Sequence, residues 1–214
     1  MKGLNRLRMV PAVALFAGLV LTPSFVSKSP AQDPDESESL VQRGFAINPV
    51  PLNLDAKNRA LVGLGSYIVN ARGNCNNCHT CPSYVGHSAA DNPFVTGGTL
   101  SEVDTPGPVN KDNYLAGGAV FPRPNGTFVS KNITPDPTAG NMPEGLTFEQ
   151  FLMVMQTGHD PDVPGHILQV MPWPIFRHMT EHDLRAVYEY LSAIPHAEPG
   201  TPPCAGADTF RIKQ

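Results

Sequence analysis

The stretch Cys75-Asn76-Asn77-Cys78-His79 decides how the rest of the chain is interpreted. Two cysteines enclose two asparagines, and a histidine directly follows the second cysteine. At this spacing each thiol can form a thioether with one vinyl group of a porphyrin, and the adjacent imidazole can bind the iron. The motif therefore predicts one covalently bound haem c, attached through Cys75 and Cys78, with His79 as an axial ligand of the iron.

Two other interpretations of such a cysteine pair fit this sequence less well. A zinc ribbon needs a second close pair of ligands, whereas the remaining cysteines, Cys81 and Cys204, are each single. A thioredoxin-like dithiol belongs in a βαβ unit, whereas the residues around Cys75 predict a helix followed by a loop. Haem attachment is therefore the favoured prediction.

Residues 1–31 have the pattern of a signal peptide. Basic residues near the start precede an apolar run over 10–21, and small residues lead to a cleavage site after Ala31. This run is too short to cross a bilayer comfortably, so we expect cleavage and no stable membrane anchor in the mature form. The mature protein is therefore expected in the periplasm.

The charge of the chain bears on its partners. It has 15 Lys and Arg against 19 Asp and Glu, which gives a formal net charge of -4 at pH 7. Because segment 1–31 carries basic residues and no acidic ones, the exported part is more acidic than the whole. This balance argues against nucleic acid as a partner. It fits either a redox partner whose docking face is basic or a simple need for solubility.

The chain after the signal peptide predicts a single domain with flexible ends. Residues 32–51 are acidic and polar without an apolar period, which is typical of a flexible leader. The domain is expected over 52–195, with a loop-rich insertion at about 80–130. Residues 196–214 form a proline-rich C-terminal tail.

The first helix of this domain is expected over 55–71, from an Asp55 N-cap to a stop at Gly73. Gly63 and Gly65 lie inside it, where each glycine costs about 1 kcal/mol relative to alanine. This cost is best explained if another helix crosses closely at the two glycines.

Two further helices are expected, over 147–158 and 180–193. The earlier one begins with a capping box of Thr147 and Gln150. Tyr190 in the later one is placed to meet the glycines of the first helix. Together the segments predict an all-α fold, with helices around one haem and long loops between them.

Segment 159–178 is interrupted by prolines and predicts an extended strap. Such a strap could cross the open face of the haem and offer Met171 as the second axial ligand, because a thioether favours ferrous iron. Trp173 is expected to contact the cofactor nearby. The alternative ligands are His87, Met142, His159 and His166, whereas Met153 and Met155 have the placement of core residues.

Polar residues beside the site allow further predictions. Asn132 and Thr134 could donate hydrogen bonds to haem propionates, although stabilisation of a local turn explains them equally well. The other ring nitrogen of His79 should donate to a backbone carbonyl of the following loop, for which we choose Pro93 or a neighbouring residue.

Cys81 and Cys204 remain outside the haem motif. Because two cysteines remain, an oxidising compartment favours a disulfide between them, and two free buried thiols are the alternative. By the entropic account such a bridge would contribute about 4–5 kcal/mol to stability.

The order of these features resembles class I cytochrome c. A glycine-bearing helix and the haem motif come first, followed by Asn132-Ile133-Thr134-Pro135-Asp136, the Met171-Pro172 loop and a last helix with Tyr190-Leu191. Over about 54–195 the chain is similar to the cytochrome c subunits that serve periplasmic alcohol and sugar dehydrogenases. The resemblance implies a cytochrome c-like fold in which the first and last helices cross near Gly65.

In that family the ligand roles fall on Cys75, Cys78, His79 and Met171. The dehydrogenase subunits often carry several haem motifs and a membrane anchor, whereas this chain has one motif and is expected to lack an anchor. Its loop between His79 and Asn132 is also longer than in small cytochromes.

We therefore expect a mono-haem carrier that passes single electrons between redox partners, namely a dehydrogenase and a terminal oxidase or reductase. With His79 and Met171 on the two sides of the iron, no substrate could bind the metal, so no catalytic activity is expected. The alternatives are a haem enzyme of peroxidase type and a haem-based sensor, each with an open distal site.

Overall fold

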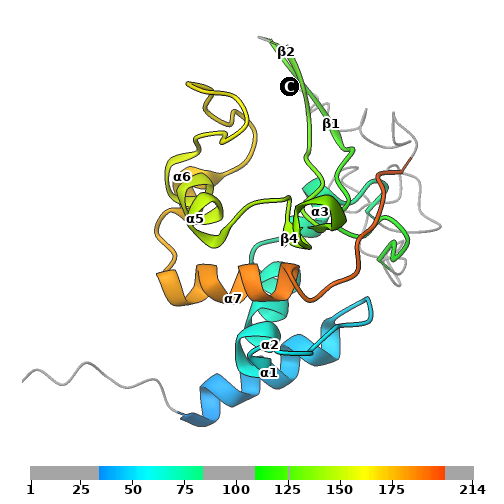
Figure 1. Cartoon of the computed structure of the whole chain (residues 1–214), viewed down its shortest axis with the longest axis vertical. Helices are drawn as coiled ribbons and strands as arrows, with labels where there is room; N and C mark the ends of the chain where they lie inside the picture. Colours follow the sequence, from blue (N-terminus) through cyan, green and yellow to red (C-terminus); the bar gives the residue numbers. More distant parts are fainter. Residues whose placement is uncertain (1–33, 84–108, 125, 201–214) are drawn as a thin grey trace, which may run out of the picture. The chain divides into compact units, whose positions relative to one another are not determined.

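Figure 1 shows the computed structural model, which describes residues 34–83, 109–124 and 126–200. The predicted signal peptide lies outside the described residues. In the part described, no helix is long and apolar enough to cross a membrane. The elements are α1 (Pro34–Ile47), α2 (Arg59–Tyr67), the π-helix η1 (Ile68–Arg72), α3 (Cys75–His79), β1 (Val120–Arg123), β2 (Gly126–Val129), β3 (Pro135–Asp136), the 3₁₀-helix η4 (Pro137–Ala139), β4 (Met142–Pro143), α5 (Phe148–Thr157), α6 (Trp173–Phe176) and α7 (Glu181–Leu191).

The prediction of a flexible leader over 32–51 was wrong, because most of this segment forms helix α1. Val41 of α1 is buried, and Val41 and Phe45 pack against Gly63 of α2. The Ser66 hydroxyl donates a hydrogen bond of 2.7 Å to the carbonyl of Gly44. The apolar stripe of α1 is narrow, and its other face is polar and exposed. The polar composition of the segment therefore suggested a flexible leader and hid the helix.

Helix α2 begins later than predicted, with Asn58 as its N-cap in place of Asp55. The Asn58 Oδ1 accepts hydrogen bonds from the backbone N–H groups of Ala60 and Leu61, at 3.0 and 3.3 Å. After Tyr67 the chain widens into the π-helix η1, which ends at Gly73 as predicted. A π-helical turn is uncommon and often marks a functional site.

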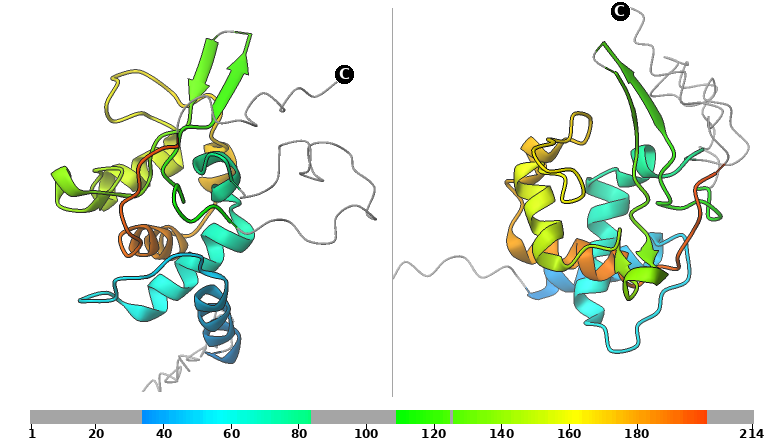
Figure 2. Two further views of the ribbon diagram at one scale, coloured as in Figure 1. Left: turned by 90° about the vertical axis from the view of Figure 1, so that its right-hand side faces the viewer. Right: turned by 45° about the horizontal axis from the view of Figure 1, so that its top comes forward.

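The predicted close crossing at Gly63 and Gly65 is confirmed, and it involves two helices. Helix α2 packs against both α1 and α7, as the views in Figure 2 show. Gly63 faces α1, whereas Gly65 faces α7, where an added Cβ would overlap the Ala186 carbonyl and lie 2.7 Å from the Tyr190 Cβ. The two glycines therefore let both neighbours approach the α2 backbone.

A buried polar network next to this crossing joins four segments. The Tyr190 hydroxyl of α7 donates to Asn48 Oδ1 at 2.9 Å and accepts from Asn70 Nδ2 at 3.2 Å. The Tyr114 hydroxyl donates to Asn70 Oδ1 at 2.6 Å and lies 3.0 Å from the Tyr190 oxygen. Satisfied buried networks of this kind hold one unique packing, because each lost partner would leave a costly unpaired group.

The helices α5 and α7 have the caps that the sequence predicts. Thr147 and Gln150 form the reciprocal capping box of α5. Thr180 caps α7 by accepting from the Asp183 N–H at 3.1 Å. The Tyr188 ring of α7 contacts the Phe148 ring of α5, with centroids 5.4 Å apart, so the two helices share the main core.

The all-α prediction holds for most of the described residues but misses two small sheets. Strands β1 and β2 form an antiparallel hairpin with Val120 opposite Val129, inside the region predicted as loop. Strands β3 and β4 form a second pair. The Asn-Gly dipeptide at 125–126 is a hairpin signal that could have indicated the first sheet.

The substitution Gly65→Ala tests the crossing of α2 and α7. Helix propensity alone would make this change stabilising by about 1 kcal/mol. Because the new methyl group would meet the rigid Ala186 carbonyl, we expect a loss of about 3 kcal/mol in the free energy of unfolding, measured with urea.

The matched control is Ala60→Gly at an exposed position of the same helix, which should cost only about 1 kcal/mol. A Gly65→Ala protein as stable as the parent would contradict the close approach of the helices.

Candidate functional site

The motif Cys75–His79 itself forms a short helix, α3, directly after η1. Asn74 links the two in a left-handed conformation, with φ of 51°. The end of α3 is fixed by Thr80, whose buried hydroxyl accepts a hydrogen bond of 2.8 Å from the N–H of Leu115. The one-turn helix therefore places both thiols and the imidazole near the same cavity.

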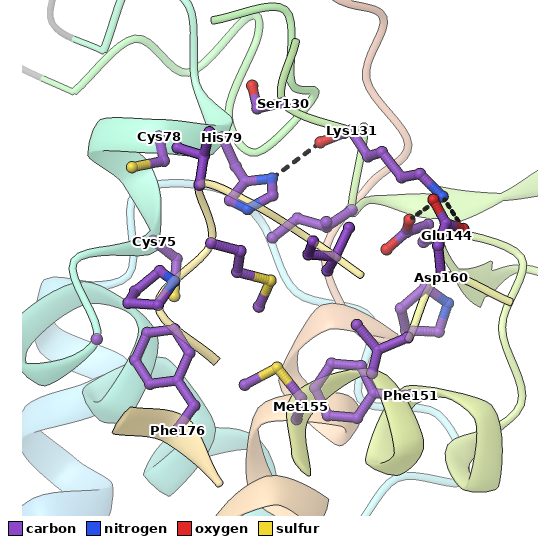
Figure 3. Close-up of a pocket in the computed structure, with 18 of the residues that line it drawn as sticks. Cys75, Cys78, His79, Ser130, Lys131, Glu144, Phe151, Met155, Asp160 and Phe176 are labelled. Carbon is purple, nitrogen blue, oxygen red and sulfur yellow. Dashed lines mark hydrogen bonds and ion pairs between the residues drawn. The ribbon is translucent and has the colours of Figure 1, made fainter. Parts of the chain in front are cut away.

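This cavity has a volume of about 330 Å³ and a mostly apolar wall. In the view of Figure 3, Cys78 and His79 lie at its upper edge, Cys75 lies on the left with Phe176 below it, and Met155 and Phe151 lie at its lower edge. Further apolar wall residues come from η1, the hairpin, β4, the segment before α6, and α7; these are Val69, Phe121, Phe128, Pro143, Leu168, Met171, Val187 and Leu191.

His79 is oriented by a hydrogen bond of 2.9 Å between its Nδ1 and the carbonyl oxygen of Lys131 (Figure 3). A carbonyl only accepts, so Nδ1 carries the proton and Nε2 keeps the lone pair that a metal needs. Burial lowers the pKa of His79, which favours the same neutral form. The choice of Pro93 as the acceptor was wrong; Pro93 itself lies outside the described residues.

The Lys131 carbonyl is held in place by the base of the β1–β2 hairpin. Gly117 donates to the His79 carbonyl at 2.6 Å, and Gly118 donates to the Ser130 carbonyl at 2.9 Å. Gly117 has a φ of 79°, and a Cβ there would lie 2.6 Å from the carbonyl carbon of Lys131. Only glycine therefore lets this strand pass between the end of α3 and Lys131.

The two motif cysteines are free thiols in the described structure. Burial and then the neighbouring Cys78 raise the pKa of Cys75 to about 12, and burial also raises the pKa of Cys78. A redox dithiol needs a lowered pKa, because the thiolate is the nucleophile. Two protonated thiols in an apolar cavity fit attachment to a porphyrin better than disulfide exchange.

Two methionines line the cavity, Met171 before α6 and Met155 on α5. Met155 is buried in the main core, as predicted, and yet its side chain also borders the cavity. The structure therefore brings two thioether groups to the wall. Of the other proposed ligands, His166 also lines the cavity, Met142, Met153 and His159 do not, and His87 lies outside the described residues.

Sequence reasoning missed a charged cluster on the same wall. The Lys131 Nζ lies 3.3 Å from Glu144 Oε1 and 3.1 Å from Asp160 Oδ1, as Figure 3 shows. It also lies 2.9 Å from Asp162 Oδ2. Burial alone would lower the pKa of Lys131, but its bond to Asp162 and the charges of Glu144 and Asp160 outweigh burial and raise it. These residues come from three separate loops, so no local motif pointed to them.

No protein-family model matches the chain. The cytochrome c subunits of alcohol dehydrogenase (quinone) from Gluconacetobacter polyoxogenes and Komagataeibacter europaeus are each 28% identical to it over 202 residues. These alignments cover 94% of this chain but 31% of each relative, so the chain spans about a third of their length. The chain resembles a dehydrogenase cytochrome c subunit.

A shorter similarity joins the chain to another dehydrogenase. One of the subunits of nicotinate dehydrogenase from Pseudomonas putida is 37% identical over 76 residues, which is 36% of this chain and 6% of that protein. The cavity fits the haem c that the resemblance to cytochrome c subunits implies. It offers two thiols and a neutral imidazole from one helical turn, with apolar side chains and thioethers around them.

Trp173 does not line the cavity, and its expected contact with a cofactor stays a prediction. Its Nε1 donates to the Leu168 carbonyl at 3.1 Å, and its ring covers Gly158 at the end of α5. Trp173 thus anchors the segment before α6, and Phe176, one helical turn later, reaches the cavity instead.

The expected extended strap over 159–178 also contains a short helix, α6, for which Pro172 is the N-cap.

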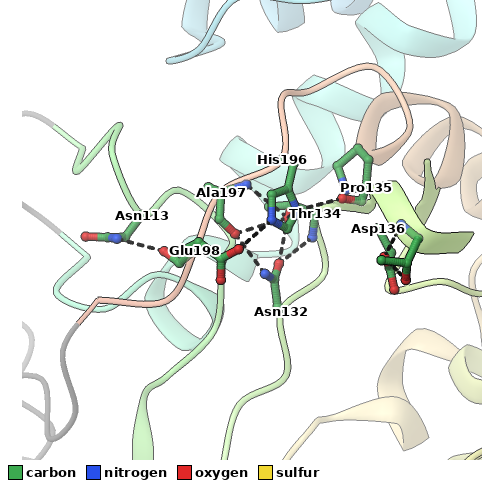
Figure 4. Close-up of polar contacts among 9 residues, drawn as sticks. Asn113, Asn132, Thr134, Pro135, Asp136, His196, Ala197 and Glu198 are labelled. Atoms are coloured by element: carbon green, nitrogen blue, oxygen red, sulfur yellow. Dashed lines mark hydrogen bonds and ion pairs between the residues drawn. The ribbon is translucent and has the colours of Figure 1, made fainter. Parts of the chain in front are cut away.

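Asn132 and Thr134 do not line the cavity either, and their proposed role at haem propionates stays a prediction. Figure 4 shows them at the start of the C-terminal tail. Asn132 Nδ2 donates to the Ala197 carbonyl at 2.8 Å, and Asn132 Oδ1 accepts from the Thr134 N–H at 2.9 Å. His196 Nδ1 adds a bond of 2.8 Å to the Pro135 carbonyl. The polar turn therefore holds the tail.

Proposed function

We propose that this chain is a mono-haem c-type cytochrome that carries single electrons from a periplasmic dehydrogenase. The observation that carries the proposal is the placement of Cys75, Cys78 and His79 at the wall of one apolar cavity, with the His79 imidazole fixed by the Lys131 carbonyl. The similarity to cytochrome c subunits of alcohol dehydrogenase supports it independently.

Each of the four residues would have a distinct role in binding the haem. Cys75 and Cys78 would hold the haem through thioethers, so its position would not depend on non-covalent binding alone. His79 Nε2 would bind the iron from one side, and Met171 would bind from the other. The bound haem would supply a metal that alternates between the ferric and ferrous states.

A carrier is favoured over a haem enzyme or a sensor because protein ligands are at hand for both axial positions. A peroxidase-type site needs a vacant position for its substrate, and a sensor needs one for its signal. Met171 and Met155 both reach the cavity wall, so a thioether can fill that position. Thioether ligation also raises the reduction potential, which suits an acceptor of electrons from a dehydrogenase.

We also propose export to the periplasm and a bridge between Cys81 and Cys204. Cys81 is buried, and Gly200 approaches it so closely that a Cβ there would lie 2.5 Å from the Cys81 carbonyl oxygen. The chain therefore passes Cys81 shortly before it reaches Cys204, which itself lies outside the described residues. An oxidising compartment would favour the bridge.

The choice of the distal ligand is tested with the variants Met171→Ala and Met155→Ala. The weak red band of the ferric protein, which reports sulfur bound to iron, should vanish in Met171→Ala because the thioether is lost. It should persist in Met155→Ala and in the control Met153→Ala, which changes an exposed methionine outside the cavity. If only Met155→Ala lost the band, Met155 of α5 would be the ligand in place of Met171.

Electron transfer is tested by mixing the oxidised protein with a quinone-dependent alcohol dehydrogenase and its alcohol. The visible spectrum should change to that of the ferrous form, and should not change when the alcohol is left out. A protein that dithionite reduces but the dehydrogenase does not would contradict this choice of donor.

A further inference from the structure

The charged cluster on the cavity wall holds more negative than positive charge. One ammonium group, Lys131, faces the carboxylates of Glu144, Asp160 and Asp162. His166 adds a second basic group, with its Nδ1 3.4 Å from Asp160 Oδ2. One lysine cannot neutralise three carboxylates, so one of them is the easiest place in the cluster to bind a proton.

Contacts and exposure indicate which carboxylate this is. Asp160 accepts hydrogen bonds from Lys131, the Asp162 N–H and His166, all of which favour its charged form. Asp162 is 66% exposed, so water solvates its charge. Glu144 is only 20% exposed and has one charged partner, the Lys131 Nζ at 3.3 Å. Glu144 is therefore the least stabilised anion of the three.

The backbone at Glu144 supports a role for its side chain. Glu144 has a φ of 54°, in the left-handed region where glycine is favoured, and its N–H donates to the Thr134 carbonyl at 3.0 Å. A side chain in this conformation costs about 1–2 kcal/mol. A carboxylate that is held on the cavity wall at such a cost points to a function.

The cluster is also joined to the proposed iron ligand. Lys131 accepts the His79 N–H with its backbone carbonyl and holds Glu144 and Asp160 with its side chain. Glu144, Asp160 and His166 line the same cavity as His79. The groups that face Glu144 among the described residues are thus Lys131, from the segment after β2, and Asp160 and Asp162, from the loop after α5.

We propose that Glu144 binds a proton when the site gains an electron and releases it when the electron leaves. This inference rests on the proposed function as an electron carrier. An electron from the dehydrogenase lowers the positive charge in a cavity of low dielectric constant, so the nearby carboxylate loses stabilisation. A proton from water then forms an O–H bond at Glu144, and that bond breaks when the electron passes to the acceptor.

The acidity of Glu144 places this exchange near neutral pH. Burial raises its pKa to about 7, against the opposing charge of Lys131. The partial exposure of Glu144 and the open position of Asp162 give the proton a way to solvent.

The test is the midpoint potential of the haem-loaded protein, measured by spectroelectrochemical titration at pH values from about 5 to 9, the range around a group that titrates near neutrality. Because the ferrous form holds the proton more tightly, the potential should fall as the pH rises through about 7 and level off on both sides. A tenfold difference in proton affinity between the two states corresponds to about 59 mV.

Variants assign this dependence to Glu144. In Glu144→Gln the fall near pH 7 should disappear, whereas the exposed control Glu149→Gln and His166→Asn should keep it. In Lys131→Met the fall should move to higher pH, because the cation that lowers the Glu144 pKa is gone. Proton uptake on reduction, followed with an indicator dye in weak buffer, shows independently whether the parent protein binds a proton when it is reduced.

A flat potential in the parent protein, or a fall that survives in Glu144→Gln, would overturn the inference. A fall that is lost in His166→Asn would assign the proton to the histidine and overturn it too. If Glu144→Gln fails to fold, the absence of proton uptake by the parent protein would have the same meaning. A protein that carries no haem would overturn the proposed function as well, so the spectrum separates the two failures.

Discussion

The hydrogen bond from His79 to the Lys131 carbonyl is the contact on which the rest of the structure depends. It fixes the proton on Nδ1, so Nε2 is the nitrogen that can bind a metal. It also joins the short helix that carries the thiols to the base of the hairpin, 52 residues further along the chain. Gly117 makes this possible, because only a residue without a Cβ fits between the two segments.

The helices provide the rigid support behind this contact. The close approach at Gly63 and Gly65 lets α2 pack between α1 and α7, and η1 leads from α2 directly into the cysteine motif. The network around Tyr190 ties the end of α1 to η1 and α7. The thiols therefore start from a fixed backbone, which a covalent attachment at two points requires.

Local patterns made much of this predictable. The cysteine motif, the capping box of Thr147 and the glycines of α2 each act through neighbours in sequence or through one repeated spacing, so the sequence alone revealed them. The helix α1 and the N-cap Asn58 were missed because polar residues dominate both segments. The identity of the carbonyl that orients His79 and the cluster around Glu144 depends on how distant loops meet, and no spacing in the sequence records that.

Three polar side chains that we expected at the cofactor have partners within the protein. Asn132, Thr134 and Trp173 have donors that suit a cofactor. In the structure Asn132 donates to the Ala197 carbonyl of the C-terminal tail, Thr134 donates to the Asn132 side chain, and Trp173 donates to the Leu168 carbonyl before α6. Chemistry alone could not decide between the two uses. Met155 shows the converse, because a residue on a core-facing stripe can still border a cavity when that cavity lies within the core.

The proposed function requires a haem that is bound covalently to the thiols of Cys75 and Cys78. The most direct measurement is the intact mass of the protein exported by cells with a working c-type maturation system, followed by mass mapping of the peptide that contains both cysteines. We expect one haem on that peptide, attached at both sulfurs and resistant to acid extraction. Unmodified thiols, or zinc in place of haem, would contradict it.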